Sequence, residues 1–150
     1  MTIERADVTN ETVADLEKAL RHISAIIKQK GREILNDYSI TPPQFIALQW
    51  LFENGDLTIG ELSNKMFLAC STTTDLVDRM EKNELVVRVK DPHDRRVVQI
   101  HLLKEGERII EEVIEKRQNY LRDKLVNFED KEIALLERSL IKLQHDMREE

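Results

Sequence analysis

The chain has 150 residues, of which 35% are charged and only 5% aromatic, and its formal net charge is −6. With four glycines and three prolines, this balance favours long, solvent-exposed helices around one core over a sheet-rich architecture. A single cysteine excludes an internal disulfide, and no grouping of it with the four histidines has metal-ligand spacing. We therefore expect one mainly α-helical domain that holds no metal and no cofactor.

The first ten residues contain acidic side chains, no apolar run and no periodicity. They predict neither a signal peptide nor a membrane span, so we expect a mobile N-terminal arm on a cytoplasmic protein. From about residue 11 to 36, apolar side chains recur at steps of three, four and seven, the pattern of a helix that packs against other helices. This stripe consists of Val13, Leu16, Leu20, Ile23, Ile27 and Ile34.

A second helix is expected to begin at Pro42, because proline suits the first helical position. Thr41 can cap this helix, and Gln44 can return the hydrogen bond in a capping box. Trp50 falls off the expected core face, so its indole either lines a ligand site or covers a neighbouring helix, the commoner role of an aromatic at helical spacing. The core face itself comprises Phe45, Leu48, Leu51 and Phe52.

Two shorter helical patterns follow between residues 57 and 82. Thr58 and Glu61 form another capping-box sequence, which predicts a helix from Ile59 with Leu62 and Met66 on one apolar face. We place three polar residues on or beside its outward face, namely Ser63, Asn64 and Lys65.

After a turn at residues 67–70, a helix over residues 71–82 is expected to bury Thr73, Leu76 and Met80. Its polar residues then point outward, where they are available to a partner molecule. They are Ser71, Thr74, Asp75, Asp78 and Lys82, flanked by Thr72 and Arg79.

Two runs of strict alternation, at residues 85–89 and 98–102, predict strands with one buried face. Residues 91–96, with the sequence Asp-Pro-His-Asp-Arg-Arg, predict the tip of a β-hairpin, because proline cannot donate to a ladder and aspartate favours turns. Asp94 can hydrogen-bond Arg96 and hold its guanidinium outward, while Arg95 stays free to approach phosphate. From Arg79 to His101 there are six basic and four acidic residues, so positive charge gathers here although the whole chain is acidic.

Helix, turn, helix and a hairpin with a basic tip form the order of a winged helix-turn-helix, whose second helix enters the major groove while the hairpin reaches a minor groove. The sequences at residues 76–82, 85–86, 91–96 and 100–106 resemble the multiple-antibiotic-resistance regulator (MarR) family of bacterial repressors. The resemblance extends over nearly the whole chain, and the hairpin tip is its most specific part. Two departures bear on the operator sequence: Ala69-Cys70 replaces a common serine-proline helix start, and Asp75 replaces a common basic residue.

On this resemblance, residues 1–150 form a single MarR-type domain, with a winged helix-turn-helix lobe at about 41–102 between dimerisation helices at about 11–36 and 107–147. It implies a homodimeric repressor on a double-stranded DNA operator, controlled by a small aromatic or anionic inducer that binds between the dimer helices and the DNA-binding lobe. The apolar stripes at the two ends of the chain favour a second copy independently, because they exceed what a small winged helix can cover. The C-terminal stripes are Ile110, Val113, Ile114, Leu121 and Leu125, then Ile133, Leu136, Leu140, Leu143 and Met147.

The expected DNA contacts divide into base contacts and phosphate contacts. Asp75 is expected to accept a hydrogen bond from a cytosine amino group, and Arg96, oriented by Asp94, to enter the minor groove. The expected base-contacting residues are Ser71, Thr72, Thr74 and Asp75, and the expected phosphate-contacting residues are Lys65, Arg79 and Arg95.

Catalysis is not expected, because the sequence has no glycine-rich phosphate loop, metal motif or nucleophile elbow. Two alternatives to a ligand-responsive DNA-binding repressor remain. A winged helix can serve as a protein-interaction module, although such modules generally lack a doubly basic tip. Cys70 lies near a helix start, where a thiol can become an oxidation sensor, so a redox-sensing repressor is the other alternative. Family members known for thiol sensing use a cysteine near the start of the first helix, which this chain lacks, so we expect Cys70 to act as a small apolar residue.

Overall fold

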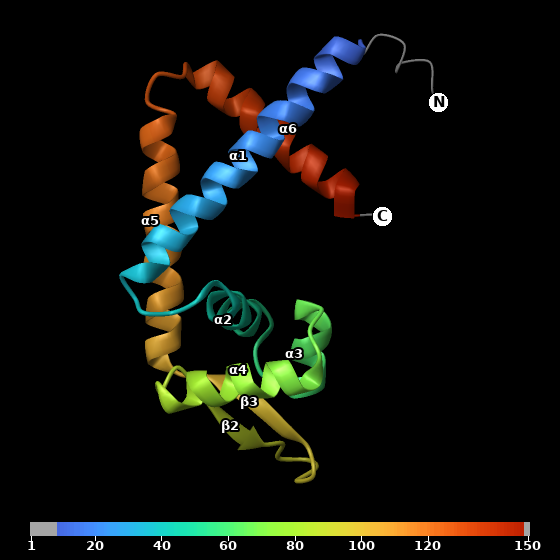
Figure 1. Ribbon diagram of the computed structural model, residues 1–150, viewed down its shortest axis with the longest axis vertical. Helices are drawn as coiled ribbons and strands as arrows, with labels where there is room; N and C mark the ends of the chain where they lie inside the picture. Colours follow the sequence, from blue (N-terminus) through green and yellow to red (C-terminus); the bar gives the residue numbers. More distant parts are fainter. Residues whose placement is uncertain (1–8, 149–150) are drawn as a thin grey trace. The chain divides into compact units, whose positions relative to one another are not determined.

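The computed structural model describes residues 9–148, so most of the expected N-terminal arm lies outside the described residues (Figure 1). These residues fall into two compact units, the first ending at Val113 and the second beginning at Ile114. In chain order the elements are α1 (Asn10–Asn36), α2 (Pro42–Asn54), β1 (Leu57–Thr58), α3 (Ile59–Met66), α4 (Cys70–Lys82), β2 (Val86–Lys90), β3 (Val98–Leu102), α5 (Lys104–Lys124) and α6 (Asp130–Arg148). The expected mainly helical architecture with a small β-hairpin is confirmed.

The core of the first unit is an apolar cluster shared by several elements. Burying each large side chain stabilises the fold by about 1.5–3 kcal/mol, so this cluster is what holds the helix-turn-helix against α5. Its largest fully buried members are Leu48 and Leu51 of α2, Leu62 of α3, Val77 and Met80 of α4, Val86 of β2, Ile100 of β3, and Ile110 and Val113 of α5.

Both expected capping boxes are present. Thr41 Oγ1 accepts the backbone N–H of Gln44 at 3.3 Å, and Gln44 Oε1 accepts that of Thr41 at 3.0 Å. At the start of α3, Thr58 Oγ1 and Glu61 Oε1 form the same pair of bonds, at 3.1 and 2.9 Å. Each box satisfies donors at a helix N-terminus that would otherwise lack a partner, which is why the starts of α2 and α3 were predictable.

The sheet is antiparallel, with the strand order β1-β3-β2. The hairpin pairs Val86 with Leu102 and Lys90 with Val98, and the short strand β1 adds to the other side of β3. The expected alternation is only partly confirmed. Ile100 is fully buried as expected, but on β2 Val86 is buried in place of Val87 and Val89, and Val98 is 39% exposed. Figure 1 shows β2 and β3 extending past α4 away from the other helices, and burial decreases toward the hairpin tip, where Lys90 is exposed.

Two expectations about burial, for Ser63 and Phe52, are wrong. Ser63 was placed on or beside the outward face of its helix, but it is 3% exposed, and its Oγ donates to the carbonyl of Gly60. Phe52, expected in the core, is 42% exposed. Phe67 ends α3 in a left-handed conformation with φ of 56°, and its ring is exposed.

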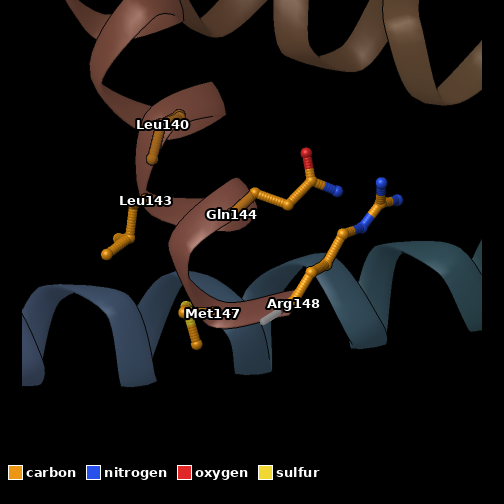
Figure 2. Close-up of a pocket in the computed structure, with 5 residues that line it drawn as sticks. All are labelled: Leu140, Leu143, Gln144, Met147 and Arg148. Atoms are coloured by element: carbon orange, nitrogen blue, oxygen red, sulfur yellow. The ribbon is translucent and has the colours of Figure 1, made fainter. Parts of the chain in front are cut away.

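The terminal helices carry apolar stripes that their own units do not cover. On α1 the stripe residues Val13, Leu16, Leu20, Ile23 and Ile27 are exposed, whereas Ile34 is buried. The second unit contains α6, none of whose residues is buried. A groove of about 420 Å³ runs along α6, where Leu140, Leu143 and Met147 lie on one side and Gln144 and Arg148 on the other (Figure 2).

Candidate nucleic-acid interface

Helix α4 presents a polar surface because its apolar residues all face the core. Thr73, Leu76, Val77 and Met80 are buried, and these positions recur at helical spacing, so the opposite face is left to solvent. Four of the expected DNA-contacting residues lie on this exposed face: Ser71, Thr72, Asp75 and Arg79.

Thr74 differs from these four residues. Its side chain is half-buried, and its hydroxyl donates to the carbonyl of Cys70 at 2.8 Å. A hydroxyl has one donor, so in this arrangement Thr74 can offer a base only acceptor lone pairs.

The N-terminus of α4 lies one residue earlier than expected, because Ala69 is the N-cap and Cys70 the first helical residue. Ala69 provides no side-chain cap. Cys70 is exposed, and its Sγ lies 3.4 Å from the hydroxyl oxygen of Ser63. Cys70 was expected to act as a small apolar residue, but it is exposed rather than packed in the core.

The wing tip, residues 91–96, is organised by two aspartates. Asp91 Oδ1 accepts the backbone N–H groups of His93 and Asp94, at 2.7 and 3.2 Å, and so closes the first turn. Backbone bonds from Asp91 to Val97 and from Val97 to Asp94 close the loop, at 2.9 Å each. Such side-chain-to-backbone bonds are the physical basis of the turn preference of aspartate.

The expected contact between Asp94 and Arg96 is present. Arg96 donates from Nε to Asp94 Oδ1 at 3.1 Å and from a terminal guanidinium nitrogen to Oδ2 at 3.3 Å. Arg95 is exposed and makes no ion pair with another described residue. The two adjacent arginines are therefore presented differently, one held by a carboxylate and one free to move.

Lys65, expected to hold a phosphate, packs against the tryptophan of α2. Its ammonium lies 5.0 Å from the centre of the Trp50 ring, within the range of a cation–π interaction. Of the two roles considered for Trp50, covering a neighbouring helix is therefore the one that the structure displays.

Arg88 on β2 is a site residue that sequence reasoning missed. Its guanidinium pairs with Asp78 at 2.7 Å and with Glu81 at 2.5 Å, both on α4. Counting local charges treated Arg88 as a free cation, but the structure shows that its charge is already matched. A basic residue soon after a helix rich in acids was the available signal, although it does not identify the partners.

A shallow groove of about 360 Å³ lies along α1. Its lining is mainly cationic and small, and all of it comes from this one helix, namely Arg21, Ser24, Ala25, Lys28 and Arg32. Arg21 is occupied by Glu17, one turn earlier, through two hydrogen bonds of 2.9 and 3.0 Å.

No helix among the described residues is both long and apolar enough to cross a membrane.

The family model for the MarR family matches residues 40–98, which include α2, α3, α4 and the wing tip. Over 138 residues the chain is 75% identical to YsmB, an uncharacterised helix-turn-helix-type transcriptional regulator of Bacillus subtilis, a match that covers 92% of this chain and 94% of that protein. It is 28% identical over 109 residues to the transcriptional repressor MdtR of the same organism, covering 73% of this chain and 70% of MdtR. These relatives are transcriptional regulators, which are not a class of enzymes.

A solved structure of a MarR family protein from Bacillus stearothermophilus superposes with a TM-score of 0.87 and 66% sequence identity. That match covers 93% of this chain and 98% of the other. Since the similarity extends over both chains almost completely and includes the winged helix-turn-helix, this protein belongs to the MarR family of transcriptional regulators.

Proposed function

We propose that this protein is a repressor that binds a pseudo-palindromic operator as a homodimer and leaves it when a small ligand binds. One observation carries the proposal. The polar face of α4, with Ser71, Thr72, Asp75 and Arg79 exposed, belongs to the same winged helix-turn-helix as a wing tip that displays Arg95 and Arg96. A recognition helix and a basic wing are the two elements that this fold uses to hold a duplex.

The proposed base contacts come from the first two turns of α4. Ser71, Thr72 and Thr74 would contact base edges, and Asp75 would accept from a cytosine amino group. The proposed phosphate contacts are Lys65, Arg79 and Arg95, and Arg96, held by Asp94, is assigned to the minor groove.

The proposed dimer rests on the exposed apolar stripes of the terminal helices. Leu16, Leu20 and Ile23 of α1 are 58, 43 and 50% exposed, and α6 exposes Leu140 and Met147 along its groove. Apolar patches of this kind mark interaction surfaces. We assign residues 11–36 and 107–147 to dimerisation and residues 41–102 to DNA binding, within one MarR-type domain.

The proposed inducer is a small aromatic or anionic molecule. Lys28 and Arg32 in the groove along α1 support the anionic alternative, because paired cations recognise carboxylates well. The relative MdtR is a transcriptional repressor, which supports repression over activation. Because the proposed target is chromosomal DNA, we place the protein in the cytoplasm.

The test begins with selection of duplexes from a random-sequence pool by the wild-type protein. The recovered sequence, called here the selected duplex, should contain two related half-sites about one helical turn apart. Titration against the selected duplex and a random duplex at several salt concentrations should give a steep salt dependence for both and much tighter binding of the former.

Analytical ultracentrifugation of the free protein should give a dimer. Two results would contradict the proposal: selection that recovers no common sequence, and binding to random DNA that does not vary with salt. A protein that fails to bind DNA but retains its fold would favour the protein-interaction module instead.

A further inference from the structure

The side chain of Arg88 joins the two elements proposed to hold DNA. It extends from the first strand of the wing, β2, to the recognition helix α4. One terminal guanidinium nitrogen donates to Asp78 Oδ1 at 2.7 Å, and the other donates to Glu81. The backbone N–H of Arg88 also donates to Glu81, at 3.1 Å to Oε2, so residue 88 holds Glu81 at two points.

The chain path makes this contact possible. Between α4 and β2, Glu84 adopts a left-handed conformation with φ of 61°, and the chain reverses so that β2 returns toward α4. Asp78 and Glu81 are three residues apart on the helix and therefore lie on the same side. A planar guanidinium can bond both carboxylates at once, which a single ammonium group does less well.

Partial burial strengthens the cluster. The side chain of Arg88 is 28% exposed and that of Glu81 is 35% exposed, so water screens the pair less than it screens a fully exposed ion pair. The contact therefore restrains the wing relative to α4 in addition to the pairing within the sheet.

The same cluster reduces the negative charge that the recognition helix presents to DNA. α4 carries three acids, Asp75, Asp78 and Glu81, and each would repel a phosphate backbone. Arg88 pairs with the last two, and its single positive charge offsets one of their two negative charges. Asp75 is the acid of α4 that forms no ion pair with another described residue, and it stays available for contact with a base.

We propose that Arg88 is a positioning residue, which holds the wing and the recognition helix as one rigid unit through Asp78 and Glu81 and makes no phosphate contact itself. This inference rests on the proposed function. It adds a role for a residue outside the expected set of DNA contacts, and it predicts that specificity depends on an arginine that never touches DNA.

The test compares Arg88→Met with the wild type on the selected duplex and on a random duplex. Methionine keeps much of the apolar stem but removes both ion pairs. We expect affinity for the selected duplex to fall roughly tenfold and affinity for random DNA to fall much less. The salt slope, which is the decrease of the logarithm of the binding constant with the logarithm of the salt concentration, should stay unchanged because no phosphate contact is lost. Arg95→Ala is the matched control, since it should lower the slope by about one for both duplexes.

Glu81→Gln is a second variant that should weaken the preference for the selected duplex. It should lower the preference for the selected duplex even though it removes a negative charge, and combining it with Arg88→Met should add little, because both changes break the same contact. Arg88→Lys keeps a charge and should give a smaller loss of preference, which keeps the test usable if Arg88→Met does not fold. Circular dichroism identifies the variants that are folded.

Three results would overturn the assignment. The first is a salt slope lowered by about one in Arg88→Met, as expected for a phosphate contact. The others are tighter binding of both duplexes by Glu81→Gln, and a folded Arg88→Met whose affinities for the selected and random duplexes keep the wild-type ratio. A wild-type protein that shows no preference for the selected duplex would instead refute the proposed function, before Arg88 is tested at all.

Discussion

The carboxylate of Asp94 receives three hydrogen bonds from Arg96, two from the guanidinium, at 3.1 and 3.3 Å, and one from the backbone N–H, at 3.1 Å. These bonds restrain a side chain that is 91% exposed and would otherwise sample many rotamers. The side-chain hydrogen bond from Arg96, followed by the backbone bond, holds the pKa of Asp94 below its ordinary value. The contact is therefore fully formed above the ordinary aspartate pKa and is lost only as pH falls through the lowered one.

Arg96→Ala and Arg95→Ala should weaken DNA binding in different ways. Arg96→Ala removes a pre-oriented cation proposed to enter a narrow A·T-rich minor groove, so it should cost about 1–3 kcal/mol and flatten the preference for the bases that flank the half-sites. Arg95→Ala should weaken selected and random duplexes about equally and lower the salt slope by about one. Titration of both duplexes at several salt concentrations distinguishes the two patterns, and equal behaviour of the two variants would show that the wing is a diffuse basic patch.

Asp94→Ala tests the orienting role directly. The change removes a negative charge near DNA, which by itself would tighten binding, yet it also releases the Arg96 guanidinium. We expect the loss of orientation to dominate, so Asp94→Ala should resemble Arg96→Ala in its loss of preference for flanking bases. Tighter binding of Asp94→Ala than of the wild type, measured with the same duplexes and with its fold checked by circular dichroism, would contradict the orienting role.

Gly106, in the first turn of α5, has no room for a side chain. A Cβ atom there would lie 2.6 Å from the carbonyl oxygen of Leu85 and 2.6 Å from Leu102 Cδ1. The Leu85 oxygen cannot yield easily, because it accepts the backbone N–H of Leu103 at 3.0 Å. Gly106→Ala should therefore lower the free energy of unfolding by about 1–3 kcal/mol, as overpacking does.

Gly31 is the matched control for Gly106, since a Cβ at this position in α1 would meet nothing within 4 Å. Replacing a glycine inside a helix by alanine stabilises by about 0.5–1 kcal/mol where space allows, so Gly31→Ala should raise the free energy of unfolding. Denaturant titrations at one fixed protein concentration compare the two variants, because the stability of a dimer depends on concentration. Equal effects of the two substitutions would contradict the packing described around Gly106.

Local signals explain which parts of the fold were predictable. The capping boxes at Thr41 and Thr58 involve residues three apart, so the sequence contains both partners of each bond. The contact between Asp94 and Arg96 is similarly local, and it too was predicted. β1 was missed because two residues, Leu57 and Thr58, carry no alternation, and their pairing with Ile100 and Gln99 depends on the tertiary fold.

The expectations that failed depend on contacts between elements. Ser63 is buried because the turn after α3 brings α4 against it, and a helical wheel for α3 alone contains no such information. The partners of Arg88 lie seven and ten residues away across a left-handed turn at Glu84. Lys65 was assigned from its charge and its place on or beside the outward face of its helix, and its packing on Trp50 could not be inferred without the crossing of α2 and α3.

Cys70→Ser tests whether the exposed thiol regulates DNA binding. We expect operator affinity to change only slightly and the response to peroxide to be the same as in the wild type, because the chain has no second cysteine to form an internal disulfide. The measurement is titration of the selected duplex before and after peroxide treatment. Release from DNA by peroxide that disappears in Cys70→Ser would establish the redox-sensing alternative.

Lys65→Met tests whether the cation that packs on Trp50 also serves DNA. As a phosphate contact, Lys65 should contribute about one to the salt slope, so Lys65→Met should lower the slope and weaken selected and random duplexes alike. Trp50 is the only tryptophan, and its ring lies 5.0 Å from the ammonium. DNA should therefore change the tryptophan emission of the wild type and affect that of Lys65→Met much less.

Lys131→Met, an exposed change on α6, is the control and should leave both the salt slope and the emission unchanged. If Lys65→Met keeps the wild-type slope but unfolds at lower denaturant, the lysine serves only to cover the indole, and the phosphate contact must come from elsewhere on the lobe.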